Sequence, residues 1–293
     1  MADPTRAVAG SAPGPWFVDD SCMGCDASRQ CAPSIFREHG ALTIVARQPE
    51  SPEDEVAATR ALLSCPTGSI GVKGRPVSMD VFPQELEPAS GVHLCGFNSP
   101  RAYGGNAWFI ARPGGNLLVD GPRWTPHLKR RFEALGGLRD VLLTHRDDLG
   151  DAERYAAAFG ARVWIHETER SAAPFATDVF AAGPRTTLRD GLEVLEVPGH
   201  TRGSVMFLLD GRWLFTGDSL FSSRHHGTLH AHRAQCWYSW PEQQRSLASL
   251  RGLPVEWVLP GHGGRARLGP GEFDAQLDAL LHRMGAPGWV DAW

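Results

Sequence analysis

Two groups of residues in this sequence have the types and spacings that bind metals. Four of the six cysteines, Cys22, Cys25, Cys31 and Cys65, fall in the N-terminal quarter of the chain. Clustered cysteines in a chain without an export signal favour metal binding over disulfides. Further along, His and Asp residues end several strand-like apolar runs, and residues at strand ends can meet at one edge of a sheet. We therefore expect two sites of metal chemistry.

The cysteines have an uneven spacing. Cys22 and Cys25 form a C-x2-C pair, Cys31 follows six residues after Cys25, and Cys65 begins the segment CPTGSI. Closely spaced thiolates on an irregular loop can surround one cluster, and a remote cysteine then closes the cage. A zinc ion on the same thiolates is the alternative that the residues leave open.

With this spacing, residues 16–72 resemble the single-cluster ferredoxin family, and the segment CPTGSI is similar to the family's closing motif. The family has a third cysteine where this sequence has Ser28. We predict that Cys31 takes that place, with Ser28 or a vacant iron position as the alternatives. The resemblance implies an iron–sulfur cluster, 4Fe-4S or 3Fe-4S, bound by Cys22, Cys25, Cys31 and Cys65.

Four strand-like runs of the longer C-terminal part end in metal-ligand residue types. Each His or Asp there is flanked by glycine or by a hydroxyl residue. Such neighbours leave room for close approach of the backbone and supply supporting hydrogen bonds. The four segments are THRDD (144–148), PGHT (198–201), TGD (216–218) and PGHG (260–263).

In this order and spacing, the four segments resemble the metallo-β-lactamase fold superfamily over about residues 90–265. The resemblance implies an αβ/βα sandwich, in which two sheets pack face to face with helices outside and the metal site lies at one edge. The implied ligands of the first metal are His145, Asp147, His200 and Asp218, and those of the second are Asp151, His262 and Asp218.

The first motif departs from the family's H-x-H-x-D-H pattern. Asp147 stands where the second His is expected, and Ala152 follows Asp151 in place of the last His. A carboxylate is a harder ligand than imidazole and suits Fe or Mn as well as Zn. We therefore expect one or two ions of Zn or Fe, with weaker binding at the second position. Asp151 and Asp218 are the predicted catalytic carboxylates, and Asp151 is the predicted general base.

A histidine-rich stretch follows the third motif. One interpretation is that one of its histidines fills the vacant ligand position, because His-rich tracts can bind metal. The other is a solvated loop. Nearby Trp237, Tyr238 and Trp240 either line a substrate pocket or pack as core. The histidines are His225, His226, His230 and His232.

Short strand-like runs alternate with helical patterns and must position these residues. In the cysteine-rich part, Ser51 followed by Pro52 predicts a helix that runs to about Leu63. Further helices are expected over 125–135, 151–159, 241–250 and 271–284. Strands are expected over 107–111, 116–120, 141–145, 162–166, 192–200, 204–209, 212–218 and 255–262.

The 293 residues are 42% apolar and 21% charged, which is ordinary for a globular protein. We expect the α/β (α+β) class, with a small ferredoxin-like domain before the sandwich. A stretch rich in proline and acidic residues is the predicted boundary. The predicted parts are a flexible leader (1–14), an iron–sulfur domain (15–78), a linker (79–90) and the metallo-β-lactamase-fold domain (91–293).

Charge and hydropathy exclude some partners. The net charge of −4 gives no basic field, so nucleic-acid binding is not expected. No run approaches the roughly 18 apolar residues that a membrane helix needs. The N-terminus lacks the apolar region of a secretory signal, so we expect a cytoplasmic protein with no membrane partner.

Three functions remain, and the first is the one we predict. It is hydrolysis of a small carbonyl substrate (a thioester, lactone or amide) by a metal-bound hydroxide. The second is an oxidoreductase, in which the cluster feeds electrons to a non-haem iron site and a redox partner protein takes part. The third is a non-catalytic, redox-responsive binding module. The metal that co-purifies, and whether it changes oxidation state, discriminates between the first two.

Overall fold

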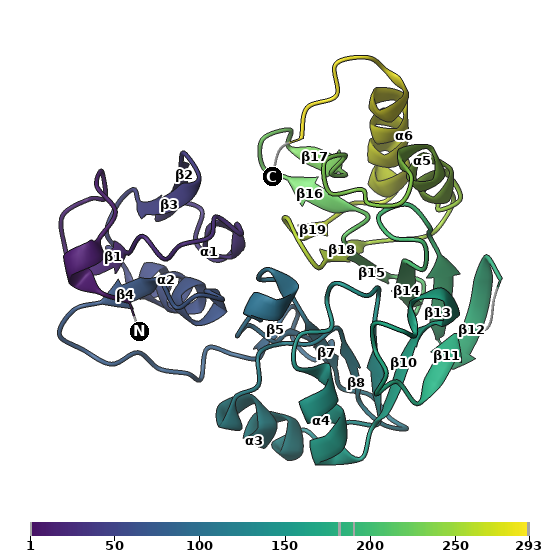
Figure 1. Ribbon diagram of the computed structural model, residues 1–293, viewed down its shortest axis with the longest axis horizontal. Coiled ribbons are helices and arrows are strands. Elements are labelled where there is room, and N and C mark those ends of the chain that lie inside the picture. Colours follow the sequence, from purple (N-terminus) through teal and green to yellow (C-terminus); the bar gives the residue numbers. More distant parts are fainter. Residues whose placement is uncertain (1, 181–182, 190, 292–293) are drawn as a thin grey trace. The chain divides into compact units, whose positions relative to one another are not determined.

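The computed structural model describes residues 2–180, 183–189 and 191–291 (Figure 1). The chain divides into two compact units, which are described in turn. The first unit comprises residues 1–140 and 150–161, and the second comprises residues 141–149 and 162–293. The mixture of helices and sheets confirms the predicted α/β class.

The N-terminal part of the first unit packs two helices with two small sheets. Helix α2 begins as predicted, because the Ser51 hydroxyl accepts the Asp54 N–H (3.1 Å) and Pro52 is the first helical residue. β1 pairs antiparallel with β4, and β2 with β3. The bounds are β1 (Trp16–Val18), α1 (Ala27–Cys31), β2 (Phe36–His39), β3 (Leu42–Val45), α2 (Pro52–Ser64) and β4 (Ile70–Val72).

The segment predicted as a flexible leader hydrogen-bonds to these strands. Val8 N–H donates to the Val18 carbonyl (2.8 Å), and Ala12 N–H donates to the Val45 carbonyl (2.7 Å). A short 3-10 turn, η1 (Pro4–Arg6), precedes them. The structure thus differs from the prediction here, because this segment satisfies its main-chain groups on the domain rather than in water.

The rest of the first unit is an antiparallel sheet with two helices. The predicted linker is part of it, because β5 (Gln84–Glu85) pairs with β6 and Phe82 is fully buried. Phe109 of β7 stacks on Phe132 of α3 with ring centroids 4.6 Å apart. The other elements are β6 (Val92–Leu94), η2 (Pro100–Ala102), β7 (Trp108–Ile110), β8 (Leu117–Val119), α3 (Pro126–Ala134) and α4 (Ala152–Phe159); β9 (Asp140–Leu142) follows α3.

The second unit contains a six-stranded sheet with the order β12-β13-β14-β15-β18-β19. β10 and β11 form a parallel pair, and β16 and β17 form a hairpin. The bounds are β10 (Arg162–His166), η3 (Glu167–Glu169), β11 (Asp178–Phe180), β12 (Arg185–Arg189), β13 (Leu192–Glu196), β14 (Val205–Leu209), β15 (Trp213–Gly217), β16 (Phe221–Ser223), β17 (Thr228–His230), α5 (Trp240–Ala248), β18 (Trp257–Pro260), β19 (Ala266–Arg267) and α6 (Glu272–Gly285).

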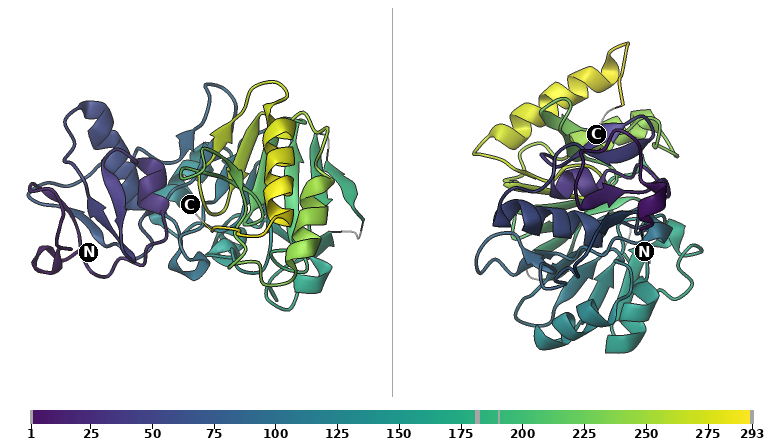
Figure 2. Two further views of the ribbon diagram at one scale, coloured as in Figure 1. Left: turned by 90° about the horizontal axis from the view of Figure 1, so that it is seen from above. Right: turned by 90° about the vertical axis from the view of Figure 1, so that its left-hand side faces the viewer.

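Helices α5 and α6 lie side by side against this sheet (Figure 2). Apolar side chains from the sheet, including Leu208 and Val258, join Leu247 of α5 and Leu277 of α6 in one buried cluster. Each of these side chains is fully buried, so the cluster fixes the sheet from which the predicted ligand segments emerge.

The predicted elements agree closely with the observed ones. The run 162–166 is β10, and the helices expected over 125–135 and 271–284 are α3 and α6 with one-residue shifts. The main difference lies at the strand ends. The run 192–200 ends as a strand at Glu196, and PGHT forms a turn after it.

Among the described residues, no helix combines the length and apolar composition that a membrane crossing requires.

Candidate metal centre and cysteine cavity

The four predicted ligand segments all lie in the second unit, at or just after strand ends. The segment that leads to His145 is held on both sides. Leu143 N–H donates to the Trp164 carbonyl and Val205 N–H donates to the Thr144 carbonyl, each at 2.9 Å. These bonds connect the segment to β10 and β14, so the position of His145 is fixed by two strands distant in sequence.

One group of ligand atoms comprises His145, Asp147 and His200. His200 Nε2 lies 3.6 Å from Asp147 Oδ2, and the two imidazole rings are perpendicular with centroids 4.7 Å apart. The Thr144 hydroxyl lies 3.0 Å from His145 Nδ1. That contact engages Nδ1, and a hydrogen bond at one ring nitrogen is the usual support of a histidine that binds a metal through the other.

A second group comprises His145, Asp148 and Asp218. His262 adjoins it, because His262 Nε2 lies 3.7 Å from Asp148 Oδ1 and 3.9 Å from Asp218 Oδ2. Asp218 Oδ2 also lies 3.6 Å from His145 Nε2 and 3.7 Å from His200 Nε2. One carboxylate oxygen therefore lies within reach of three imidazole nitrogens.

These separations fit a shared cation better than direct hydrogen bonds. Two ligands at zinc distances in a tetrahedron are about 3.3–3.4 Å apart, whereas a hydrogen bond is shorter than the 3.6–3.9 Å found here. His200 Nε2, Asp148 Oδ2 and Asp218 Oδ1 are buried atoms with no hydrogen-bond partner among the described residues. Buried polar atoms normally have partners, so the donor set fits a metal.

The charges of the group shift its pKa values in opposite directions. Burial alone would raise the pKa of Asp218, but the nearby His262 and His145 hold it well below its usual range. Burial and the neighbouring Asp218 raise the pKa of Asp148. Burial would lower the pKa of His262, but Asp218 and Asp148 raise it to about 9. A buried set with these opposed shifts is typical of a functional site.

Two glycines allow the loops to approach closely. A Cβ on Gly261 would lie 2.4 Å from Asp148 Oδ2 and 2.6 Å from Asp218 Oδ1, inside their van der Waals contact. A Cβ on Gly199 would lie 2.3 Å from the Cβ of Gln243 on α5. Any larger residue at either position would displace a ligand loop, which explains the glycine before each histidine of the PGH segments.

Glu169 is a positioning residue that sequence reasoning missed. Its carboxylate accepts hydrogen bonds from Arg146 N–H (2.7 Å, to Oε2) and from Gly203 N–H (3.1 Å, to Oε1). It thereby joins the loop of His145 to the loop of His200, and it is 2% exposed. A fully buried carboxylate is rare unless its oxygens are satisfied. No sequence pattern indicates this role, because the segment ETER is typical of an ordinary polar turn.

The structure places Asp148 where the sequence analysis expected Asp151. Asp148 is 2% exposed and belongs to one of the two metal-ligand groups, whereas Asp151 belongs to neither. The Asp151 carboxylate instead accepts the Trp124 N–H (2.7 Å) and lies 3.4 Å from the Arg101 guanidinium. The segment THRDD contains Asp148, but comparison with the family's H-x-H-x-D-H pattern selected Asp147 and Asp151 instead.

The histidine-rich stretch forms the β16–β17 hairpin and the loop after it. His230 Nε2 lies 3.0 Å from the Val290 carbonyl, and the His230 ring stacks on Trp289 with centroids 4.5 Å apart. The ring of His232 stacks on Phe221 with centroids 5.0 Å apart. Among the described residues, neither metal-ligand group includes a histidine of this stretch.

The aromatic segment after this stretch covers the turn that carries His200. Trp237 N–H donates to the His200 carbonyl (2.8 Å), and the Trp237 ring lies 6.4 Å from the His200 ring. Trp237 and Tyr238 are 60% and 51% exposed. Two large exposed aromatic side chains beside a buried metal ligand are suited to contact a substrate.

A small cavity in the first unit brings most of the predicted cluster ligands together. Cys22, Cys25, Ser28 and Cys65 all line it. Burial raises the pKa of the Cys25 thiol to about 12, and the nearby Cys65 and Cys22 add to the effect. Three thiols this close are stable as thiolates only with a cation between them, so the donor set fits a metal cluster.

Cys31, the predicted third ligand, is not among the residues that line this cavity. It is the last residue of α1, and its Sγ lies 3.6 Å from the Ser64 hydroxyl of α2. Ser28 occupies the cavity wall one helical turn earlier. The physical reason for the difference is the helix itself, because three residues of helix rise about 4.5 Å along its axis.

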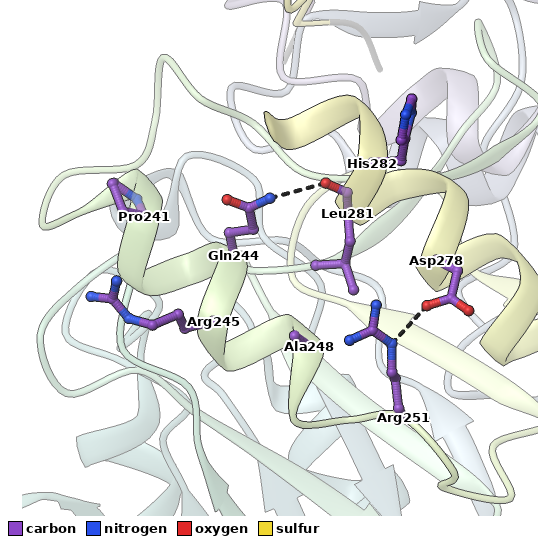
Figure 3. Close-up of a pocket in the computed structure, with 8 residues that line it drawn as sticks. All are labelled: Pro241, Gln244, Arg245, Ala248, Arg251, Asp278, Leu281 and His282. Atoms are coloured by element: carbon purple, nitrogen blue, oxygen red, sulfur yellow. Dashed lines mark hydrogen bonds and ion pairs between the residues drawn. The ribbon is translucent and has the colours of Figure 1, made fainter. Parts of the chain in front are cut away.

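Another surface feature, a groove between α5 and α6, contains none of the predicted ligands (Figure 3). Gln244 donates across it to the Leu281 carbonyl (3.0 Å), and Arg251 pairs with Asp278 (2.6 Å). These contacts join the two helices, so we interpret the groove as part of their packing.

Comparison with known proteins agrees with both parts of the chain. Residues 92–263 match the metallo-beta-lactamase superfamily, and residues 18–72 match the 4Fe-4S single cluster domain of Ferredoxin I. The first match covers more than half of the 293 residues, so the chain belongs to the metallo-beta-lactamase superfamily. The prediction of this fold with an N-terminal ferredoxin-like domain is confirmed.

Several curated relatives carry the name hydroxyacylglutathione hydrolase. That of Fuscovulum blasticum is 32% identical over 157 residues, which are 52% of this chain and 59% of that protein. That of Acidiphilium cryptum is 34% identical over 120 residues, or 40% and 49% of the two chains. One from Cereibacter sphaeroides is 34% identical over 186 residues, or 60% and 69%. The chain thus spans about half to two thirds of these relatives.

Solved structures show the same fold at low identity. An archaeal metallo-beta-lactamase superfamily protein from Sulfolobus tokodaii superposes with a TM-score of 0.51 at 16% identity, covering 70% of this chain and 90% of that one. A metallo-beta-lactamase from Hirschia baltica gives a TM-score of 0.51 at 17% identity, covering 67% and 96%. Identities this low establish the fold and nothing finer.

Proposed function

We propose that the chain is a metal-dependent hydrolase of a small thioester. The observation that carries the proposal is that one carboxylate oxygen of Asp218 lies within 3.9 Å of imidazole nitrogens of His145, His200 and His262. The curated relatives named hydroxyacylglutathione hydrolase favour a thioester over the lactone and amide alternatives.

The protein's own residues would hold one or two cations. His145, His200 and Asp147 would hold the first, and His262 with Asp148 the second. Asp218 lies within 3.9 Å of all three imidazoles and would serve both. A cation bound there lowers the pKa of water toward neutrality and acts as a Lewis acid toward a carbonyl oxygen.

The exposed fractions of the side chains show which side of the site solvent can reach. The side chain of Asp147 is 45% exposed, whereas those of His145 and His200 are almost fully buried. Trp237 and Tyr238 lie beside His200 and are exposed. We infer that a substrate approaches from the side of Asp147, and that the two aromatic rings bind its apolar part and exclude water from the reacting carbonyl.

The test is turnover of the full chain after anaerobic purification and loading with Zn, Fe or Mn. The substrates are a hydroxyacylglutathione thioester, a lactone and an amide. Metal-dependent hydrolysis of the thioester, lost in His200→Ala and kept in His282→Ala, supports the proposal. His282 is the matched control because it is an exposed histidine on α6. Retention of metal without turnover of any of the three would contradict it.

A second candidate is an oxidoreductase that works at an iron site. The observation in its favour is the number of carboxylates, because Asp147, Asp148 and Asp218 together form a hard donor set that suits iron. An iron that changes oxidation state when the purified protein is treated with dithionite, in a protein that does not cleave the thioester, would favour this candidate.

A further inference from the structure

We propose that Ser28, rather than Cys31, occupies the fourth ligand position of the iron–sulfur cluster. One iron of the cluster then lacks a thiolate ligand. The consequence is a cluster with a labile corner, which loses one iron when it is oxidised and regains it from iron(II) on reduction. This inference concerns the N-terminal domain and is independent of the proposed hydrolase activity.

The first observation is the composition of the cavity wall. Three cysteines line a single small cavity together with two serines, Ser28 and Ser69, and Cys25 and Cys65 are both buried. The Ser69 hydroxyl already contacts the Cys65 sulfur (3.2 Å). Ser28 is 7% exposed. It stands three residues after Cys25, just as Cys25 stands three residues after Cys22. A run of ligands at every third residue is how bacterial ferredoxins surround one cluster, so Ser28 is the residue in register.

The second observation is the environment of Cys31. Its sulfur lies 3.6 Å from the Ser64 hydroxyl of α2, and Cys31 is not among the residues that line the cavity. Cys31 ends α1, and residue 32 already has non-helical backbone angles. In this structure Cys31 therefore contacts α2, whereas Ser28 lines the cavity.

The third observation is what holds Ser28 in place. Asp26 precedes α1 with a left-handed backbone (φ 69°), and its carboxylate pairs with Arg29 at 2.6 Å, with both side chains buried. Arg29 also donates to the Thr43 hydroxyl of β3 (3.2 Å) and to the Gly24 carbonyl (3.5 Å). A buried, multiply bonded guanidinium fixes its surroundings, so the loop cannot rotate Ser28 away cheaply.

The fourth observation is that residues from outside the ferredoxin-like segment pack on the part of the chain that carries Cys25 and α1. The Tyr103 hydroxyl donates to the Met23 carbonyl (2.9 Å). A Cβ on Gly104 would lie 3.0 Å from Cys25 Sγ, so this loop packs directly on that cysteine. Asn106 further donates to the Gln30 side chain of α1 (2.9 Å). These contacts help to hold Cys25 and α1 in place.

The chemistry of the donor explains the labile corner. A hydroxyl oxygen is harder and, when neutral, a weaker ligand of a sulfide-bridged iron than a thiolate. Oxidation by a one-electron oxidant then proceeds as [4Fe–4S]2+ + A → [3Fe–4S]+ + Fe2+ + A−. The iron–oxygen bond and the three iron–sulfide bonds of that iron break, the released ion is iron(II), and the electron goes to A. Three thiolates remain on the three-iron cluster.

The experiment uses the full chain, reconstituted anaerobically with iron and sulfide and then treated with ferricyanide as the oxidant. Iron and acid-labile sulfide are counted before and after, and electron paramagnetic resonance detects the half-integer-spin signal of a [3Fe–4S]+ cluster. We expect the unmodified protein to lose one iron in four with its sulfide retained, and to recover it with iron(II) and dithionite. Ser28→Cys should keep its iron under the same oxidant.

Cys31→Ala is the matched variant, because it removes the only other cysteine of the segment. The proposal expects its iron count and its spectrum to equal those of the unmodified protein. Loss of the cluster in Cys31→Ala, or equal iron loss in Ser28→Cys and the unmodified protein, would overturn it. Binding of zinc with no labile sulfide would also overturn it. The thermal midpoint of each variant shows that the domain has folded, and if Ser28→Cys does not fold, the Cys31→Ala comparison still decides.

Discussion

The cysteine cavity and the histidine–carboxylate group are built in different ways. Three of the proposed cluster ligands, Cys22, Cys25 and Ser28, come from one segment of seven residues that runs into α1, and Cys65 follows α2. The candidate ligands of the second unit come from four segments spread between residues 145 and 262. A site built mostly from one short segment is fixed by local backbone geometry, whereas a site assembled from strand ends requires the complete sheet.

The two sites also differ in the residue that stands where the family has a ligand. In the cavity, a serine replaces a cysteine at the same point of the loop, so one donor becomes weaker while the geometry is kept. In the second unit, Asp147 stands where the family has a histidine, and the neighbouring Asp148 adds a second carboxylate to the same loop. There the charge of the site changes, and buried histidines balance it. The first change alters ligand strength and the second alters electrostatics.

The largest expected effect tests whether the metal site of the second unit depends on residues that come from separate strands. His200→Ala and Asp218→Ala should each lower thioester hydrolysis by about a thousand-fold or more, because the cation supplies several kcal/mol of transition-state stabilisation. Both should lose the ion of the second unit and keep the iron of the cluster. Separate metal analysis for each site checks this. Loss of cluster iron in His200→Ala would show that the sites are not independent.

The next prediction compares the two neighbouring aspartates. Asp148→Ala should remove or weaken one metal position, because its carboxylate lies 3.7 Å from His262. Asp151→Ala should retain the metal and lower the free energy of unfolding by about 1–2 kcal/mol, since it loses the bond to Trp124 N–H. Metal stoichiometry and denaturant unfolding of both variants are the measurements. The reverse pattern would restore Asp151 as the metal ligand that the sequence predicted.

A third prediction concerns the residue that joins two ligand loops. Glu169→Ala should weaken metal affinity by about 10- to 100-fold, which is typical for the loss of a residue that orients metal ligands. The variant leaves Arg146 N–H and Gly203 N–H without their carboxylate acceptor. Competition with a chelator measures the affinity. Glu169 is not among the residues that line the cysteine cavity, so the iron and sulfide content should not change.

The smallest expected effect, for a change of one pH unit, is a pH dependence of metal affinity. In the metal-free protein, carboxylates raise the pKa of His262 to about 9, so His262 carries a proton at pH 7. A metal needs the lone pair, so binding must release that proton. Affinity should therefore fall about tenfold for each pH unit below about 9. Calorimetry in buffers of different ionisation enthalpy measures the proton release. An affinity that is flat from pH 6 to 8 would show that His262 is neutral or does not bind.

Many elements and the types of candidate ligands could be predicted from the amino-acid sequence, and the resemblance of the motifs indicated the fold. The predicted runs match their strands and helices within one or two residues at most ends, because side-chain burial repeats with the period of each element, whereas β11, β12, β16, β17 and β19 were not predicted. The motifs PGHT, TGD and PGHG contain the candidate ligands His200, Asp218 and His262, since glycine beside such a residue reflects a close approach that few other residues allow. The C-x2-C pair and Cys-Pro contain the three cysteines that line the cavity.

Which of two neighbouring residues lines each site is apparent only from the folded chain. Ser28 and Cys31 lie three residues apart, as do Asp148 and Asp151, and residue type favoured Cys31 while the family motif favoured Asp151. The structure instead brings Ser28 to the cavity and Asp148 to a group of candidate metal ligands. The direction of α1 takes Cys31 toward α2, and the hydrogen bond from Trp124 holds Asp151 within the first unit. The role of Glu169 was likewise apparent only from the tertiary structure. Side-chain direction depends on the path of the backbone and on partners distant in sequence, and neither is written in a local motif.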